Sequence, residues 1–273
     1  MLIQNISGYF EHIKNKTYID RYPSTVINPD ELRNGDVMEF GCGFGNDVSF
    51  LIENLIVAPN NYFLIESNAD CYVETSDRLE KLFFARWNPT QRLDKCFLPC
   101  DLSDYSDEIA MFEMRFQQWI HTNLFFGSVL KNNFADNLVD FVYANNFLHC
   151  LGYRTIHEEF RVPLMNFSSL DKIIGVVRES YRLLRHHGVF FGRTLSNQVD
   201  LGRLVTLENK LEKSEKEEFV IRTTKALQEG ELVGISRSEL EAYATDVGFT
   251  GIYIEIRESE WKPIIDFYFR FEK

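Results

Sequence analysis

One stretch of the chain, Val37–Asp47, constrains the fold more than any other. A short apolar run is followed by glycines at three alternate positions, namely Gly41, Gly43 and Gly45. Alternate glycines remove Cβ atoms where a ligand must lie against the backbone, and they permit a positive φ in a tight turn. An amphipathic helix begins near Asn46 or Asp47. The stretch therefore predicts a strand, a turn and a helix that open a doubly wound α/β sheet.

The glycine loop departs from the pattern that binds the pyrophosphate of a dinucleotide. That pattern is Gly-x-Gly-x-x-Gly/Ala, and Asn46 stands where its third small residue belongs. Asp47 also places a negative charge at the start of the predicted helix, where a phosphate would need the positive end of the helix dipole. A nicotinamide oxidoreductase is therefore disfavoured, and a turn without any ligand is the other alternative.

The composition indicates a globular chain, and we expect one elaborated domain over residues 1–273. Apolar residues make up 45% and aromatic residues 14%, which is enough for a large core. The net charge of −12 disfavours nucleic acid and anionic membranes as partners. No segment approaches the roughly 18 apolar residues of a membrane span, and Glu11 and Lys14 interrupt any signal-peptide core. We expect a cytoplasmic protein.

The five cysteines form no regular disulfide framework. They are Cys42, Cys71, Cys96, Cys100 and Cys150. Only Cys96 and Cys100 are closely spaced, and no histidine lies near them, so we expect no metal site.

The glycine loop and its flanks resemble the first motif of the class I S-adenosylmethionine-dependent methyltransferases. In that family an acidic residue precedes Gly-x-Gly-x-Gly, as Glu39 does here. The family's loop holds the methionine end and ribose of a cofactor that carries a sulfonium cation and no phosphate. The resemblance implies a cofactor site that contains Glu39, Gly41, Cys42, Gly43 and Gly45.

The end of the second predicted strand extends the resemblance. Glu66 follows the apolar run Tyr62–Ile65, and a carboxylate there can accept hydrogen bonds from both ribose hydroxyls. The alternative is an exposed surface acid without a role. Ser67 joins the implied cofactor site, and with Asn68 it could cap the following helix.

The third strand is predicted at Cys96–Leu98. In the family an Asp after this strand receives the adenine amino group while its neighbour packs on the ring. The resemblance assigns these roles to Asp101 and Leu102, and an N-cap is the alternative for Asp101. Residues 103–135 then predict a crossover helix with an elaborated loop, in which the aromatic residues up to Phe126 recur at helical spacing.

The fourth predicted strand, Leu138–Ala144, resembles the family's fourth motif, because it continues through polar residues into an apolar-Leu-His sequence. The resemblance places Asn145 at the cofactor and Asn146 at the substrate. His149 is assigned to the substrate site and, as a catalytic residue, to taking a proton from the acceptor; a structural hydrogen bond is its alternative. The Asn-Pro-Pro-Tyr signature is missing, which disfavours methyltransferases acting on adenine or glutamine amino groups.

The remaining landmarks follow in family order. Arg182–Gly188 resembles a helix-turn block, predicting a helix over 170–184 that stops at Gly188 and a strand at Val189–Leu195. Residues 196–232 are highly charged and predict a solvated helical insertion. Residues 233–273 predict a helix from Ser236 to a stop at Gly248, followed by a β-hairpin.

Together these features imply an α/β, Rossmann-like class I methyltransferase fold. Its seven-stranded mixed sheet would have the order 3-2-1-4-5-7-6, with strand 7 antiparallel and helices on both faces. Residues 30–195 would form the cofactor-binding core. Residues 1–29 predict either an N-terminal helical lid, with Tyr18 and Tyr22 facing the substrate, or a helix that only covers a sheet edge.

The implied activity is in-line transfer of a methyl group from S-adenosyl-L-methionine to a small-molecule acceptor, leaving S-adenosyl-L-homocysteine. Such enzymes act mainly by positioning the reactants and excluding water, so catalytic residues are weakly marked in sequence. The alternative is a non-catalytic methyltransferase-like protein that binds the cofactor or regulates another protein. The acceptor atom and the oligomeric state stay open.

Overall fold

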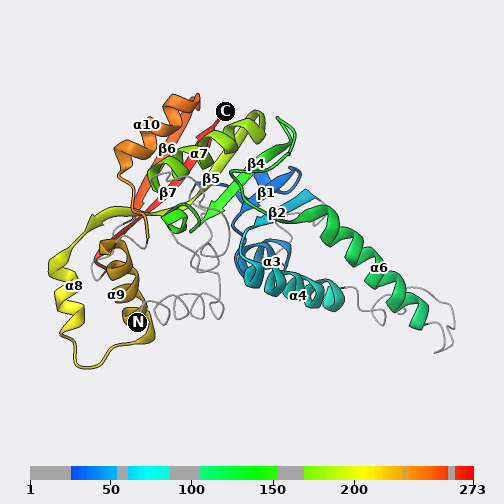
Figure 1. The fold of residues 1–273 in the computed structure, drawn as a ribbon, viewed down its shortest axis with the longest axis horizontal. Helices are drawn as coiled ribbons and strands as arrows, with labels where there is room; N and C mark the ends of the chain where they lie inside the picture. The colour runs from blue at the N-terminus through cyan, green and yellow to red at the C-terminus, as the bar shows by residue number, and fades with distance from the viewer. Residues whose placement is uncertain (1–25, 54–60, 87–104, 153–168, 230–231, 258–261) are drawn as a thin grey trace, which may run out of the picture.

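The computed structural model describes residues 26–53, 61–86, 105–152, 169–229, 232–257 and 262–273 (Figure 1). One seven-stranded sheet runs through them in the order β3-β2-β1-β4-β5-β7-β6. The strands are β1 (Val37–Phe40), β2 (Tyr62–Glu66), β3 (Leu124–Phe126), β4 (Val139–Asn145), β5 (Leu184–Val199), β6 (Gly251–Arg257) and β7 (Ile264–Glu272). Neighbours are parallel except β7, which is antiparallel to β5 and β6. The predicted order and direction are confirmed.

Helices lie on both faces of this sheet, with α7 and α10 on one side and α3 and α4 on the other (Figure 1). The described helices are α2 (Pro29–Leu32), α3 (Asn46–Glu53), α4 (Ala69–Arg86), α6 (Tyr105–Asn123), the 3₁₀ turn η4 (Leu148–Gly152), α7 (Ser169–Leu183), α8 (Leu201–Glu208), α9 (Glu215–Gln228) and α10 (Arg237–Val247).

The alternation of side chains along the strands builds two cores. On β4, Val142 faces the core beneath α7 and α10, while Tyr143 faces the core beneath α3, α4 and α6. On the neighbouring β5, Phe190 faces the same core as Val142, and Phe191 faces the same core as Tyr143. Phe191 stacks on Tyr143 with ring centroids 4.9 Å apart. Strands that are covered on both faces have nearly continuous apolar sequences, and for this reason the parallel strands could be predicted from the sequence.

The third strand is not where the sequence placed it. The prediction at Cys96–Leu98 falls outside the described residues, and β3 is formed by Leu124–Phe126. Those residues were expected to be helical, and that prediction was wrong. The Asn123 amide donates to the Tyr62 carbonyl at 2.9 Å, and the Gly127 N–H donates to the Glu66 carbonyl at 2.8 Å. These bonds hold three apolar residues against β2, a pairing that a short apolar run cannot reveal by periodicity.

The end of α7 also differs from the prediction. The helix stops at Leu183, β5 begins directly afterwards, and the residue with a positive φ is His187 (66°) rather than Gly188. The Nζ of Lys273 donates to the carbonyls of Tyr181 and Leu184 at 2.8 and 2.6 Å. A cation from the far end of the chain therefore satisfies these terminal carbonyls.

The C-terminal predictions are confirmed. Ser236 and Glu239 form a capping box at the start of α10, and Gly248 ends the helix with φ 114°. The β6–β7 hairpin follows. The charged segment forms two helices, α8 and α9, which extend away from the sheet at the end of β5 (Figure 1). Their small shared core consists of Leu204, Leu207, Val220 and Ile221.

Among the described helices, none combines the length and the apolar character that crossing a bilayer requires.

Candidate functional site

The glycine loop lies where β1 passes into α3, at the carboxyl edge of the sheet. Gly41, Gly43 and Gly45 all have positive φ, at 64°, 56° and 68°. The Gly41 N–H donates to the carbonyl of Ile65 on β2, and the Gly45 N–H donates to the carbonyl of Cys42, both at 2.9 Å. The loop is therefore tied both to itself and to the neighbouring strand.

The three glycines are required for different reasons. A Cβ at Gly41 would overlap the ring of Phe147, and a Cβ at Gly45 would lie 2.9 Å from the Thr75 side chain. A Cβ at Gly43 would meet nothing within 4 Å. Gly43 is thus the loop position where a ligand can lie directly against the backbone.

Glu66, the last residue of β2, forms hydrogen bonds with this loop. One carboxylate oxygen accepts the Gly43 N–H at 2.8 Å, and the other accepts the N–H groups of Ser67 and Asn68, each at 2.8 Å. The residue is only 7% exposed, so it is not the surface acid that the sequence left open. Burial raises the pKa of Glu66, and the three backbone hydrogen bonds oppose that rise.

Glu39, at the third position of β1, is a second buried carboxyl group. It is 2% exposed and accepts a hydrogen bond from the Tyr62 hydroxyl at 2.8 Å. Burial, together with the nearby Asp47 carboxylate, raises the pKa of Glu39 well above its usual range. Glu39 is therefore a buried acid close to the Asp47 carboxylate at the start of α3.

Asp47, in the first turn of α3, connects the loop to the end of β4. Its Oδ2 accepts from the Asn145 amide at 2.7 Å and from the Tyr143 hydroxyl at 3.1 Å. Asn145 is 8% exposed, and its Oδ1 has no hydrogen-bond partner among the described residues. The Asn145 Oδ1, a buried acceptor beside the loop, is therefore available to a hydrogen-bond donor of a ligand.

Thr75, on α4, was not identified from the sequence. Its hydroxyl donates to the Gly43 carbonyl at 2.6 Å, and the Cys42 thiol donates to the Thr75 hydroxyl oxygen at 3.9 Å. Nothing in the spacing pairs a residue in mid-helix with the loop, because only the packing of α4 against α3 brings them together. Burial raises the pKa of Cys42 well above its usual range, so this thiol stays protonated.

Asn146 and His149 lie beyond the end of β4, on the side of β5. Asn146 has φ 56°, and its N–H donates to the carbonyl of Arg193 at 2.9 Å. His149 lies in η4, is 1% exposed, and its carbonyl accepts the N–H of Val233 at 2.9 Å. The structure thus places His149 in a buried turn that supports the edge of the sheet.

Four predicted site residues lie outside the described part of the chain, namely Tyr18, Tyr22, Asp101 and Leu102. Directly after β3, the N–H of Gly127 donates to the carbonyl of Glu66 at 2.8 Å. Phe126, 59% exposed, stands beside Tyr72 with ring centroids 5.5 Å apart. Sequence reasoning missed this aromatic edge because it placed β3 elsewhere.

The charges of the site suit a cation. Three acidic side chains lie around the loop, and each accepts hydrogen bonds from neutral donors. These donors are backbone N–H groups for Glu66, the Tyr62 hydroxyl for Glu39, and the Tyr143 hydroxyl and Asn145 amide for Asp47. No group of three or more potential metal ligands is found within the described ranges. A sulfonium and an ammonium group fit these surroundings, whereas a pyrophosphate would face Asp47.

Comparison with known proteins adds to this picture. No protein-family model and no curated protein sequence significantly matches the chain. Solved structures do match it. One, from Galdieria sulphuraria and provisionally assigned as a sarcosine dimethylglycine methyltransferase, has a TM-score of 0.50 at 11% identity, over 92% of this chain and 84% of that one.

Two other structures are similar at lower TM-scores. A methyltransferase dependent on S-adenosylmethionine from Thermotoga maritima has a TM-score of 0.45 and 12% identity, over 97% of both chains. Geranyl diphosphate C-methyltransferase from Streptomyces coelicolor A3(2), solved with Mg²⁺, geranyl diphosphate and S-adenosyl-L-homocysteine, has 0.47 and 11%, over 88% of this chain and 74% of that one.

At sequence identities this low, the similarity shows the fold alone. The strand order of this chain, β3-β2-β1-β4-β5-β7-β6, is the one expected for that fold. This chain has the fold of the class I S-adenosylmethionine-dependent methyltransferases.

Proposed function

We propose that this protein binds S-adenosyl-L-methionine and transfers its methyl group to a small-molecule acceptor. One observation carries the proposal: the open backbone at Gly43 lies beside the buried carboxylate of Glu66, in a loop of three glycines with positive φ. This arrangement offers a flat surface for a ligand and an acceptor for its hydroxyl groups.

Each part of the loop would have a separate role in holding the cofactor. The glycines provide close approach to the backbone, and Glu66 would accept the ribose hydroxyls with the acceptor capacity left beside its three N–H partners. Asp47 would favour the positive charges of the methionine end. When bound, the cofactor supplies an electrophilic methyl group.

The acceptor would approach from beyond β4, past Asn145 and Asn146. The residues of the chain would hold it in line with the methyl group and exclude water, which is the main source of rate enhancement in this chemistry. The net charge of −12 argues against a polyanionic acceptor such as nucleic acid. Tyr18, Tyr22, Asn146 and His149 remain proposed substrate contacts. For His149 the two alternatives are a base that takes a proton from the acceptor and a structural hydrogen bond, and its burial favours the structural role.

A second candidate is a cofactor-binding protein without turnover. It is favoured by the ring of Phe147, which packs against Gly41 at the end of the loop nearest β4. If that ring stays in place, it narrows the path by which an acceptor reaches the methyl group.

Two measurements test these candidates in order. Isothermal titration with S-adenosyl-L-homocysteine and with NAD should show binding of the first and none of the second. Binding of NAD alone would refute both candidates. Gly43→Val should abolish binding, because it places a branched side chain where the ligand lies. Transfer of radiolabel from S-adenosyl-L-methionine to an acceptor pool then supports the enzyme, and cofactor binding without any transfer supports the second candidate.

A further inference from the structure

A pocket of about 590 Å³ lies at the carboxyl edge of the sheet, where the charged helices α8 and α9 join the core. The end of β5, the starts of α7, α8 and α10, and the end of α9 contribute to its lining. The apolar side chains among the described lining residues are Leu170, Val199, Leu201, Leu227, Leu232 and Val233. A pocket of this size with a largely apolar lining is typical of small-molecule sites.

One wall of this pocket, residues 232–235, is fixed by backbone pairing with β5. The Ile235 N–H donates to the Leu195 carbonyl, and the Ile235 carbonyl accepts the Asn197 N–H, both at 3.2 Å. A Cβ at Gly234 would lie 2.4 Å from the Cα of Asn197, so glycine is needed for this close approach. The wall is therefore formed by the fold itself.

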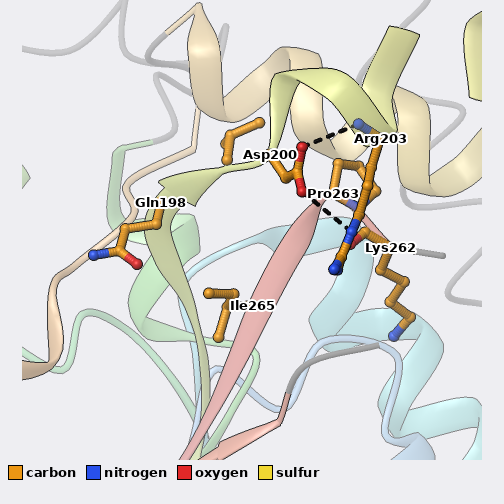
Figure 2. A pocket seen from close by; sticks show the side chains of 7 residues that line it. Gln198, Asp200, Arg203, Lys262, Pro263 and Ile265 are labelled. Atoms are coloured by element: carbon orange, nitrogen blue, oxygen red, sulfur yellow. Dashed lines mark hydrogen bonds and ion pairs between the residues drawn. The ribbon is translucent and has the colours of Figure 1, made fainter. Parts of the chain in front are cut away.

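A second wall begins at Leu201, the first residue of α8. The residue before it is held from two sides. The Asp200 N–H donates to the Pro263 carbonyl at 2.8 Å, and one side-chain oxygen of Asp200 accepts the Arg203 N–H at 3.0 Å as the N-cap of the helix (Figure 2). Leu201 itself is 58% exposed. A ligand in the pocket would cover this side chain and remove apolar surface from water.

The pocket adjoins η4, the turn that follows β4. The N–H of Val233, a lining residue, donates to the His149 carbonyl of η4 at 2.9 Å. Asn145, the last residue of β4, donates to Asp47 at the cofactor loop. The pocket therefore lies on the side from which the proposed acceptor would approach the methyl group.

The strand register gives the length that such an acceptor needs. Asn145 is aligned with Arg193 on β5, and Asn197 of the pocket lies four residues further along the same chain. An extended strand rises about 3.3 Å per residue, so roughly 13 Å separate the end of β4 from this part of the pocket. A molecule that reaches both places must be elongated.

We propose that this pocket binds a hydrocarbon group of the methyl acceptor, which is therefore an elongated, lipophilic small molecule. The inference rests on the proposed methyltransferase function and assigns a chemical class to its acceptor. Each methylene group that the pocket buries should raise the affinity about fourfold. A compact polar acceptor would neither reach the pocket nor gain affinity from its apolar lining.

Displacement of 1-aminoanthracene, a neutral dye whose fluorescence rises in apolar surroundings, tests the pocket. The dye should bind the wild-type protein, and 1-octanol should displace it at an at least tenfold lower concentration than 1-butanol, because four more methylene groups are buried. Leu201→Asn should weaken the binding of the dye and of 1-octanol at least fivefold.

Val205→Asn is the matched control. Val205 lies one turn after Leu201 on α8 and is similarly exposed, at 52%, but it is not among the described residues that line the pocket. It should leave both affinities unchanged. Because both side chains are exposed, both variants should keep the unfolding temperature of the wild type. Equal displacement by the two alcohols, or equal effects of the two substitutions, would overturn the proposal.

Two further measurements separate the pocket from the methyltransferase function. Binding of S-adenosyl-L-homocysteine without binding of the dye would remove only the pocket. Binding of the dye without the cofactor product would remove the methyltransferase function and the acceptor role with it. Radiolabel transfer should occur to an ethyl acetate extract of the acceptor pool. Transfer only to the water-soluble remainder would overturn the lipophilic class and leave the enzyme, whereas cofactor binding without any transfer would remove the acceptor role.

Discussion

The carboxylate of Glu66 accepts the backbone N–H of Gly43 at 2.8 Å, although Glu66 ends β2 and Gly43 lies in the loop after β1. This bond fixes the most open glycine of the loop against the end of the neighbouring strand. The same carboxylate is the proposed acceptor for the ribose hydroxyls. Loop geometry and cofactor affinity should therefore depend together on one side chain.

Replacing Glu66 with Ala should affect both properties. The change leaves three backbone N–H groups without their acceptor, so we expect a loss of about 1–3 kcal/mol in the free energy of unfolding. Affinity for S-adenosyl-L-homocysteine should fall about tenfold or more, since charge-assisted hydrogen bonds to the ribose are lost. Urea denaturation and isothermal titration measure the two effects.

Glu80→Ala is the matched control for that experiment, because Glu80 is an exposed acid on α4. It should change neither quantity. If Glu66→Ala leaves the dissociation constant of S-adenosyl-L-homocysteine unchanged, Glu66 stabilises the loop and does not bind the cofactor.

Alanine at Gly43 and at Gly45 should give contrasting results. Both positions have a positive φ, which costs about 1–2 kcal/mol for an L-residue. Only Gly45→Ala adds a collision, with Thr75, so it should destabilise the fold more. Gly43→Ala should be the milder change in stability and the more damaging one for cofactor affinity. The reverse ranking of affinities would mean that the ligand does not lie against Gly43.

Glu39→Gln should make the ligand-free protein more stable at neutral pH. A carboxyl group whose pKa is raised on folding binds its proton more tightly in the native state, so its contribution to stability is complete at low pH. That contribution is lost as the pH rises above the ordinary value of 4.5. Gln keeps the shape and can accept from Tyr62 without titrating.

The free energy of unfolding of Glu39→Gln minus that of the wild type should therefore grow between pH 5 and pH 8, by about 1 kcal/mol or more. Urea denaturation at both pH values measures it, and the other carboxylates cancel in the difference. A pH-independent difference would show that Glu39 is already ionised.

His149→Gln separates the two roles weighed for this residue. Gln retains a hydrogen-bonding side chain but cannot take a proton at neutral pH. Because His149 is 1% exposed, we expect a structural role, with a stability loss of about 1–2 kcal/mol and turnover within a few-fold of the wild type. A drop in turnover of a hundredfold or more, at unchanged cofactor affinity, would instead establish His149 as the base.

The sequence determined the features whose cause is local. Alternate glycines require a turn with positive φ, and the apolar runs Tyr62–Ile65 and Leu138–Ala144 are typical of buried parallel strands. The capping box at Ser236 and the stop at Gly248 set the ends of α10. With the family order of these landmarks, they were sufficient to predict the strand order and directions of the sheet, although not the residues that form β3.

The tertiary structure decided which distant residues meet, because no spacing along the chain encodes a contact between separate elements. Thr75 reaches Gly43 only through the packing of α4, and Lys273 reaches the end of α7 only because β7 lies beside β5. Leu124–Phe126 becomes a strand because β2 offers open backbone partners, a tertiary effect that outweighs the helical periodicity of three apolar residues.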